Sequence, residues 1–109
     1  MSAPRIAALR RRLTLEEAVR SDDAAGGAFL SWQLRDVMWA AVVPRVGAEG
    51  DRADATAAVV SHDIWLRHHT GVRPAMRFRD GARLFEILSV LEVDGARRWL
   101  KCRTREIAP

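Results

Sequence analysis

Apolar side chains recur at every second position over much of this chain. Leu30, Trp32 and Leu34 alternate with polar residues, and Met76 and Phe78 alternate with arginines. Successive side chains of a β-strand point to opposite faces, so this period indicates strands with one buried face. No long segment carries the 3.6-residue period of an amphipathic helix. The chain therefore belongs to the all-β class.

Turn signals divide the alternating segments into about six strands. Asp80-Gly81 and Asp94-Gly95 are typical of tight turns between antiparallel strands. Breaks in the alternation at Glu16-Glu17 and near Asp36 predict bulges, which allow a long strand to bend. We predict a small antiparallel β-barrel, with a compact sandwich as the alternative. The expected strands cover residues 13–19, 30–43, 60–67, 76–79, 84–93 and 97–107.

A long loop is predicted after the second strand, which Pro44 ends. Residues 45–55 contain two glycines and five charged residues, and Val46 is their only sizeable apolar side chain. Such a segment cannot bury itself. Loops of this length in a compact domain are usually functional or disordered.

The composition allows one domain held together by packing alone. The chain has 109 residues, of which 49% are hydrophobic, so one modest core is available. Cys102 is the only cysteine, which rules out an internal disulfide and leaves no ligand spacing for zinc. We divide the chain into a basic arm, residues 1–12, and one barrel domain, residues 13–109. No apolar run approaches the roughly 18 residues of a membrane span, and no signal peptide is evident, so we expect a cytoplasmic protein unless it leaves inside a particle.

The formal net charge is +4, and Lys101 is the only lysine. Arginine favours planar contacts with carboxylate and phosphate, so acidic partners and nucleic acid both remain open. A nucleic-acid reader would interleave aromatic residues with its charges on one face. Trp99 stands between Arg98 and Lys101, but the chain has no tyrosine. The sequence supports no specific recognition, and its charge is compatible with weak, sequence-independent attraction to DNA.

The motifs that could suggest chemistry are weak. Ser61-His62-Asp63 contains the residue types of a hydrolase triad, but neighbours in a strand face opposite ways, so His62 cannot relay between the other two. We interpret His62 as a half-buried histidine held by hydrogen bonds. His68 and His69 lie about 20 Å along the strand from His62 and offer no metal-ligand spacing. We expect no catalytic residues, no metal and no cofactor.

Several strands carry apolar residues on both faces, although a small barrel has only one interior. Trp65 lies opposite the face of Ile64 and Leu66, and Trp99 lies beside Leu100. The surplus is covered either by the arm and the loop or by neighbouring subunits. Tryptophan is a frequent interface anchor. We predict a subunit interface formed by Trp65, Leu88, Val90 and Trp99.

Five segments in order give the chain a resemblance to the phage head–tail joining, or head-closure, family. They span most of the chain, and no single one is diagnostic. The segments are Arg12-Leu13-Thr14-Leu15-Glu16, the Trp32 to Pro44 strand, Ser61-His62-Asp63-Ile64-Trp65-Leu66-Arg67, Gly71-Val72-Arg73-Pro74-Ala75-Met76-Arg77-Phe78 and the stretch from Ile87 to Arg98.

The resemblance implies a structural role in the neck of a phage or of a phage-derived gene-transfer particle. Such a subunit forms a homo-oligomeric ring between the portal and adaptor ring above and the tail-terminator ring below, near double-stranded DNA and away from membranes. The long loop would project into the channel as a gate, and the basic arm would contact a neighbouring ring through Arg10, Arg11 and Arg12. The alternative is a small-barrel nucleic-acid-binding protein. The matching loop residues are Arg45, Glu49, Asp51, Arg52 and Asp54.

Overall fold

The computed structural model describes residues 9–45, 60–69, 71–93 and 98–107, and these form six strands. The strands close into a barrel in the order β1-β2-β3-β6-β5-β4, and every pair is antiparallel. The described residues contain no helix, and so none that could cross a membrane. The predicted all-β class and barrel are confirmed. The bounds are β1 (Arg11–Asp22), β2 (Ala28–Pro44), β3 (His62–Arg67), β4 (Arg77–Asp80), β5 (Arg83–Val93) and β6 (Trp99–Ile107).

The strand boundaries differ from the predicted ones by one to three residues at most strand ends, and two of these differences change the assignment of residues. β1 begins at Arg11, so Arg11 and Arg12 belong to the barrel and not to the arm. β3 begins at His62 and not at residue 60. The turn between β4 and β5 is formed as predicted, with Gly81 at a φ of 62°, a conformation that favours glycine.

A bulge between β1 and β2 lies where the alternation breaks in the sequence. Leu15 pairs with Asp36 and Glu16 pairs with Leu34, so Arg35 is the extra residue. On the barrel side of the bulge, Leu13 and Leu15 point into the core. The core is completed by residues of all the other strands and of the β3–β4 connection: Ala40, Ile64, Leu66, Val72, Met76, Phe78, Phe85, Ile87, Leu100 and Cys102.

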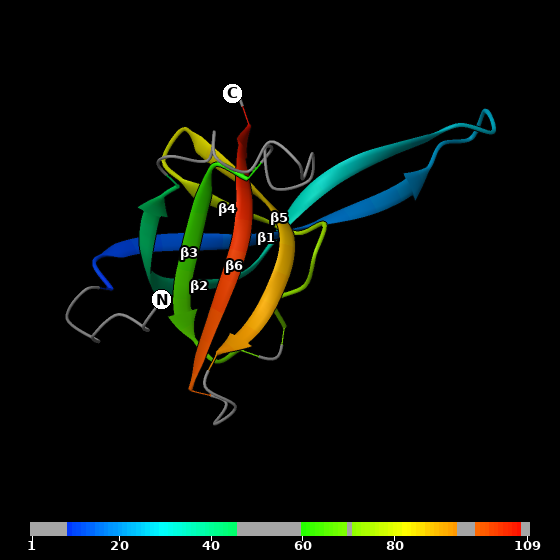
Figure 1. Ribbon diagram of the computed structural model, residues 1–109. Coiled ribbons are helices and arrows are strands. Elements are labelled where there is room, and N and C mark those ends of the chain that lie inside the picture. Colours follow the sequence, from blue (N-terminus) through cyan, green and yellow to red (C-terminus); the bar gives the residue numbers. More distant parts are fainter. Residues whose placement is uncertain (1–8, 46–59, 70, 94–97, 108–109) are drawn as a thin grey trace, which may run out of the picture.

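Beyond the bulge, β1 and β2 leave the barrel as a two-stranded ribbon (Figure 1). β1 pairs with β4 only at Thr14–Glu16, and β2 pairs with β3 only from Ala40 to Pro44. We call the projecting part, residues 17–22 and 28–34, the ribbon. The radius of gyration is 15.2 Å, compared with about 13 Å for a compact domain of this size. The ribbon is the projection that Figure 1 shows at the upper right.

A second bulge lies in β5. Ile87 pairs with Thr104 and Ser89 pairs with Arg103, so Leu88 is the extra residue. Because a strand has a period of two, one inserted residue reverses the faces of everything that follows. Val90 consequently packs against the core, while Leu91 is 40% exposed.

Candidate functional site

The exposed large apolar residues are concentrated on one strand. All but one of them belong to β2, and the exception, Leu91, lies on β5. A contiguous exposed apolar surface on a small protein usually marks a contact site. The residues are Phe29 (57% exposed), Leu30 (63%), Trp32 (37%), Leu34 (61%), Val37 (37%), Trp39 (57%) and Val43 (37%).

The register of the ribbon separates its two faces. Residues that pair across the strands share a face, and Ala18 pairs with Trp32 while Arg20 pairs with Leu30. Leu34 lies on this face by the same alternation, and Asp22, paired with Ala28, ends it near the tip. We call this the apolar face of the ribbon. The opposite face carries Val19 and Phe29 among polar residues.

An ion-pair cluster fixes the base of the ribbon to β4. Arg77 Nε donates to Glu16 Oε1 at 2.7 Å, and Arg79 Nε donates to Glu16 Oε2 at 3.0 Å. Burial acts to raise the pKa of Glu16, but the hydrogen bonds from both arginines outweigh it and lower the pKa below its ordinary value of 4.5. The Arg77 guanidinium also lies 3.9 Å from the centre of the Trp32 ring. The ribbon therefore leaves the barrel at a defined angle.

The neighbouring carboxylate, Glu17, ties the ribbon to two further arginines. Arg35 Nε donates to Glu17 Oε1 at 2.8 Å, and Arg73, from the β3–β4 connection, donates to the other carboxylate oxygen. All of these side chains are partly exposed, so each contact contributes little by itself. Glu16 and Glu17, the two carboxylates at the base of the ribbon, are thus each bound by two arginines.

A row of alternating arginine and tryptophan crosses the outside of the barrel. Arg12 on β1 pairs with Trp39 on β2, and Arg67 on β3 pairs with Trp99 on β6. The register of β2 and β3, which pairs the inward residues Ala40 and Leu66, brings Trp39 beside Arg67. Arg12, Trp39 and Arg67 are exposed and Trp99 is half-buried. We call these four residues the arginine–tryptophan row.

A half-open cavity of about 280 Å³ adjoins this row, with Trp39 and Arg67 in its wall. Its rim is polar: His69 Nε2 lies 2.6 Å from Asp36 Oδ2, and His68 Nε2 lies 3.1 Å from Glu92 Oε1. The hydrogen bond from His69 lowers the pKa of Asp36. The cavity is therefore bordered by Trp39 and Arg67 of the row and by one carboxylate, Asp36, while Glu92 contacts its wall through His68.

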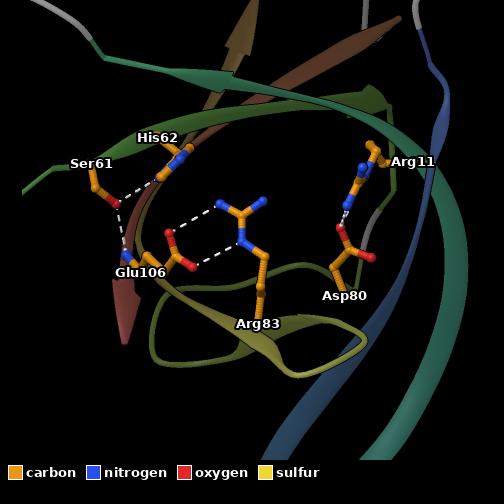
Figure 2. Close-up of polar contacts among 6 residues, drawn as sticks. All are labelled: Arg11, Ser61, His62, Asp80, Arg83 and Glu106. Carbon is orange, nitrogen blue, oxygen red and sulfur yellow. Dashed lines mark hydrogen bonds and ion pairs between the residues drawn. The ribbon is translucent and has the colours of Figure 1, made fainter. Parts of the chain in front are cut away.

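Figure 2 shows a polar network at another opening of the barrel, around a cavity of about 120 Å³. Arg83 donates to both carboxylate oxygens of Glu106, at 2.9 and 3.0 Å, and these hydrogen bonds lower the pKa of Glu106. The Glu106 backbone N–H donates to Ser61 Oγ at 2.7 Å, and Ser61 Oγ lies 2.8 Å from His62 Nδ1. The network holds the start of β3 against β6.

The network forms no catalytic relay. His62 contacts Ser61, which precedes the strand, but it does not also contact Asp63. Asp63 points to the outside of the barrel, where Lys101 Nζ lies 3.8 Å and Arg45 Nη1 3.9 Å from its carboxylate. Burial lowers the pKa of His62, which is half-buried as predicted. Among the described side chains, no group of three or more metal-ligating residues occurs.

The stems of the predicted gating loop are well defined. The Arg45 backbone N–H donates to the Ser61 carbonyl at 2.9 Å, and the Ser61 N–H donates to the Thr104 carbonyl at 2.8 Å. Glu49, Asp51, Arg52 and Asp54 lie outside the described residues. The two ends of the loop, at Arg45 and Ser61, are therefore held together beside the network that Figure 2 shows.

The predicted interface residues are divided among three environments. Trp65 faces outward but is only 2% exposed, and Lys101 Nζ lies 5.5 Å from its ring centre. Val90 was assigned to the wrong face, because the bulge at Leu88 turns it toward the core. Leu88 and Trp99 are half-buried on the outside.

The sequence analysis did not anticipate the exposed residues of the ribbon. It interpreted Leu30, Trp32 and Leu34 as the buried face of a barrel strand. The signal that was available is length: β2 has 17 residues, compared with 5 to 6 for an average strand. So long a strand in a small barrel must extend past it.

The arginines assigned to a neighbouring ring are also divided. Arg11 Nε donates to Asp80 Oδ2 at 2.9 Å, a contact drawn in Figure 2. Arg12 belongs to the row, and Arg10 is exposed just before β1. Arg11 is therefore bound to a carboxylate of β4 within the barrel.

These observations define a class: a small closed β-barrel whose exposed apolar ribbon and basic outer row are suited to association with other proteins. The chain belongs to the phage head completion protein family, whose model matches residues 4–107. This match confirms the resemblance drawn from the sequence. A search of curated proteins found no match.

Two solved structures resemble the chain over nearly its whole length. A chain from the virion of a native gene transfer agent particle is 36% identical, with a TM-score of 0.65, and the match covers 97% of this chain and 99% of that one. Protein SF1141 from Shigella flexneri 2a, solved in solution, is 25% identical with a TM-score of 0.76, covering 93% and 95% of the two chains.

Proposed function

We propose that this chain is a structural head-closure subunit, which forms a ring in the neck of a phage or phage-like particle and closes the DNA channel. One observation carries the proposal: the 36% identity to a chain of a gene-transfer-agent virion, over almost the full length of both chains. The subunit acts by assembly and not by catalysis. The concentration of exposed apolar residues on β2 supports this role.

The proposed partners follow from the position in the neck. The ring contacts the portal and adaptor ring on one side and the tail-terminator ring on the other, beside double-stranded DNA and away from membranes. Assembly takes place in the cytoplasm of the producing cell. Trp65, Leu88 and Trp99 remain proposed subunit contacts, and Arg10 and Arg12 remain proposed contacts to a neighbouring ring.

The gate is proposed to be the segment that begins at Arg45. With Arg45 and Arg52 against Glu49, Asp51 and Asp54, the segment is slightly acidic, which suits plugging the channel or repelling DNA better than gripping it. Its hydrogen-bonded stems provide a fixed base from which it can reach the channel. Deletion of residues 47–54 should yield assembled heads that lose their DNA, and heads that keep their DNA would remove this loop from the mechanism.

The proposal is tested by electron microscopy of particles from producing cells in which the gene is deleted. We expect separate tails and heads that have lost DNA, and complementation by the intact gene should restore tailed particles. Tailed, DNA-filled particles in the deletion strain would refute the head-closure role.

A second candidate, a nucleic-acid-binding barrel, is favoured by the arginine–tryptophan row, because bases and phosphates prefer such surfaces. It predicts that the isolated chain binds DNA with a steep salt dependence and that Arg67→Ala weakens this binding. A head-closure subunit binds DNA weakly as a monomer.

A further inference from the structure

We propose that the ribbon of one copy lies on the arginine–tryptophan row of a neighbouring copy. Its apolar face covers Trp39 and Trp99, and Asp22 meets Arg67. This inference rests on the proposed ring and names the surfaces that close it. It assigns the contact to β1 and β2, outside the interface predicted from the sequence.

The ribbon requires a partner because it cannot bury its own apolar face. A two-stranded hairpin is at best marginally stable in water, and three or more strands or a second layer are needed. Leu30 and Leu34 are 63% and 61% exposed, although they share one face with Trp32. Both outer backbone edges of the ribbon also lack a neighbouring strand among the described residues.

The charges of the ribbon single out one carboxylate. Glu16 and Glu17 are each held by two arginines, and Asp23 Oδ1 caps the turn by accepting from the backbone N–H groups of Ala25 and Gly27. Asp22 is exposed and lies on the apolar face, beyond Leu30. Arg20, paired with Leu30, is the basic residue of the same face and lies two positions before Asp22. A largely apolar face that ends in a carboxylate fits a surface that combines aromatic rings with arginine.

The arginine–tryptophan row complements this face of the ribbon, because it combines an exposed aromatic ring with arginines. Trp39 is 57% exposed, and neither Arg12 nor Arg67 has an acidic partner among the described side chains. These guanidinium groups alternate with tryptophans in the register, so they are well placed to pair with a carboxylate that arrives together with apolar side chains. The adjoining cavity of about 280 Å³ can receive a large side chain of the ribbon.

The two surfaces cannot meet within one chain. Arg12 and Asp22 lie at opposite ends of β1, about 30 Å apart along an extended strand. In Figure 1 the ribbon leaves at the upper right, whereas β3 ends and β6 begins at the bottom of the barrel. Each copy thus carries a donor and an acceptor surface in different places, which gives a head-to-tail contact that can close into a ring.

Nucleic acid fits the row less well than a second copy does. Two carboxylates, Asp36 and Glu92, adjoin the row through their contacts with His69 and His68. These carboxylates repel each of the many phosphates that a DNA strand would lay across the row, whereas the apolar face of the ribbon brings one carboxylate, Asp22, accompanied by Arg20. DNA would also leave the apolar face of the ribbon uncovered.

Charge reversal tests the contact on the full-length chain. Asp22→Arg and Arg67→Asp both alter exposed residues, so neither should unfold the barrel, which circular dichroism verifies. Each variant alone should self-associate about tenfold more weakly than the wild type in sedimentation velocity. Mixed in equal amounts, the two variants should associate again, because every contact then joins opposite charges. Arg103→Asp, on the same outer face of β6, is the matched control and should have no effect.

A second measurement decides the case in which the isolated chain stays monomeric. With Asp22→Cys and Arg67→Cys in one chain, oxidation of assembled particles should give a ladder of linked subunits, and either change alone should give none. Cys102 is buried and cannot contribute.

Absence of the ladder in particles overturns the contact. Where the wild-type chain self-associates in solution, a mixture of variants that fails to associate overturns it as well. If Arg67→Asp abolishes DNA binding while Asp22→Arg changes nothing, the row is a nucleic-acid site and the inference is wrong. The head-closure role is judged separately, by the gene deletion: particles that need the gene but give no ladder would retain the function and place the ring contact elsewhere.

Discussion

Replacement of Glu16 by Gln should destabilise the barrel strongly, although the two side chains have nearly the same size. The Glu16 side chain is 12% exposed and accepts hydrogen bonds from Arg77, which is 13% exposed, and from Arg79. The amide of Gln has one acceptor oxygen, and its NH₂ group would face a guanidinium. The change therefore removes at least one charge-assisted hydrogen bond and leaves a nearly buried Arg77 without its counter-charge. Together these losses amount to about 2–4 kcal/mol.

Urea unfolding followed by intrinsic tryptophan fluorescence measures this loss, and calorimetry should show a melting temperature lowered by roughly 15 °C for a domain of this size. Glu86→Gln is the matched control, because Glu86 pairs with Arg105 across neighbouring strands but both side chains are well exposed, at 34% and 50%. The control should lose less than about 1 kcal/mol. Equal losses for the two variants would show that burial of the Glu16 cluster does not determine its strength.

Three further predictions concern the core, the thiol and pH. Phe78→Ala should cost about 3–5 kcal/mol in urea unfolding, because Phe78 is fully buried, whereas Leu30→Ala should leave monomer stability nearly unchanged. Burial raises the pKa of Cys102 to about 12, so a thiol-alkylating reagent should modify it only after denaturant is added, and rapid labelling of the native chain would contradict this. Burial also lowers the pKa of His62 below 6.5, so on acidification the unfolded chain takes up a proton before the folded chain does. The free energy of unfolding should therefore fall as the pH drops below about 6.5, and His62→Gln should abolish this pH dependence. A second loss should follow below pH 4.5, where the lowered pKa of Glu16 means that the unfolded state again takes up protons first.

The strands and turns were predictable because their signals are local. The period of two, the Asp-Gly turn at Asp80 and the end of β2 at Pro44 act within a few residues, and the structure reproduces each of them. The bulge at Arg35 was also visible, since an inserted residue interrupts the alternation of β2 near Asp36 in the sequence itself. The assignment of Arg11 to a basic arm was wrong, because Arg11 pairs with Asp80, which is 69 residues away in the sequence.

The exposed surfaces could not be predicted because they depend on register and on strand pairing. The stretch around Leu88 is apolar at nearly every position, so its bulge leaves no break in the alternation, and the face of Val90 was misassigned. The exposure of Leu30 depends on whether β3 pairs with that part of β2, and the β2 sequence alone does not contain this information. The burial of Trp65 on the outside of the barrel likewise depends on groups distant in the chain.

The bulge at Arg35 divides the β1–β2 hairpin into a part that belongs to the barrel and a part that projects from it. On one side, β1 and β2 are strands of a closed barrel, whose backbone groups are paired and whose apolar side chains are buried. On the other side, the same two strands continue with exposed leucines, and no other described strand pairs with them. Glu16 lies at the boundary and binds arginines of β4, so the group that stabilises the barrel also sets the direction of the ribbon. A variant that loosens this cluster should therefore impair assembly even at temperatures where the barrel remains folded. Its ribbon would point in a range of directions, and fixing it in one direction on binding would cost conformational entropy and weaken the contact.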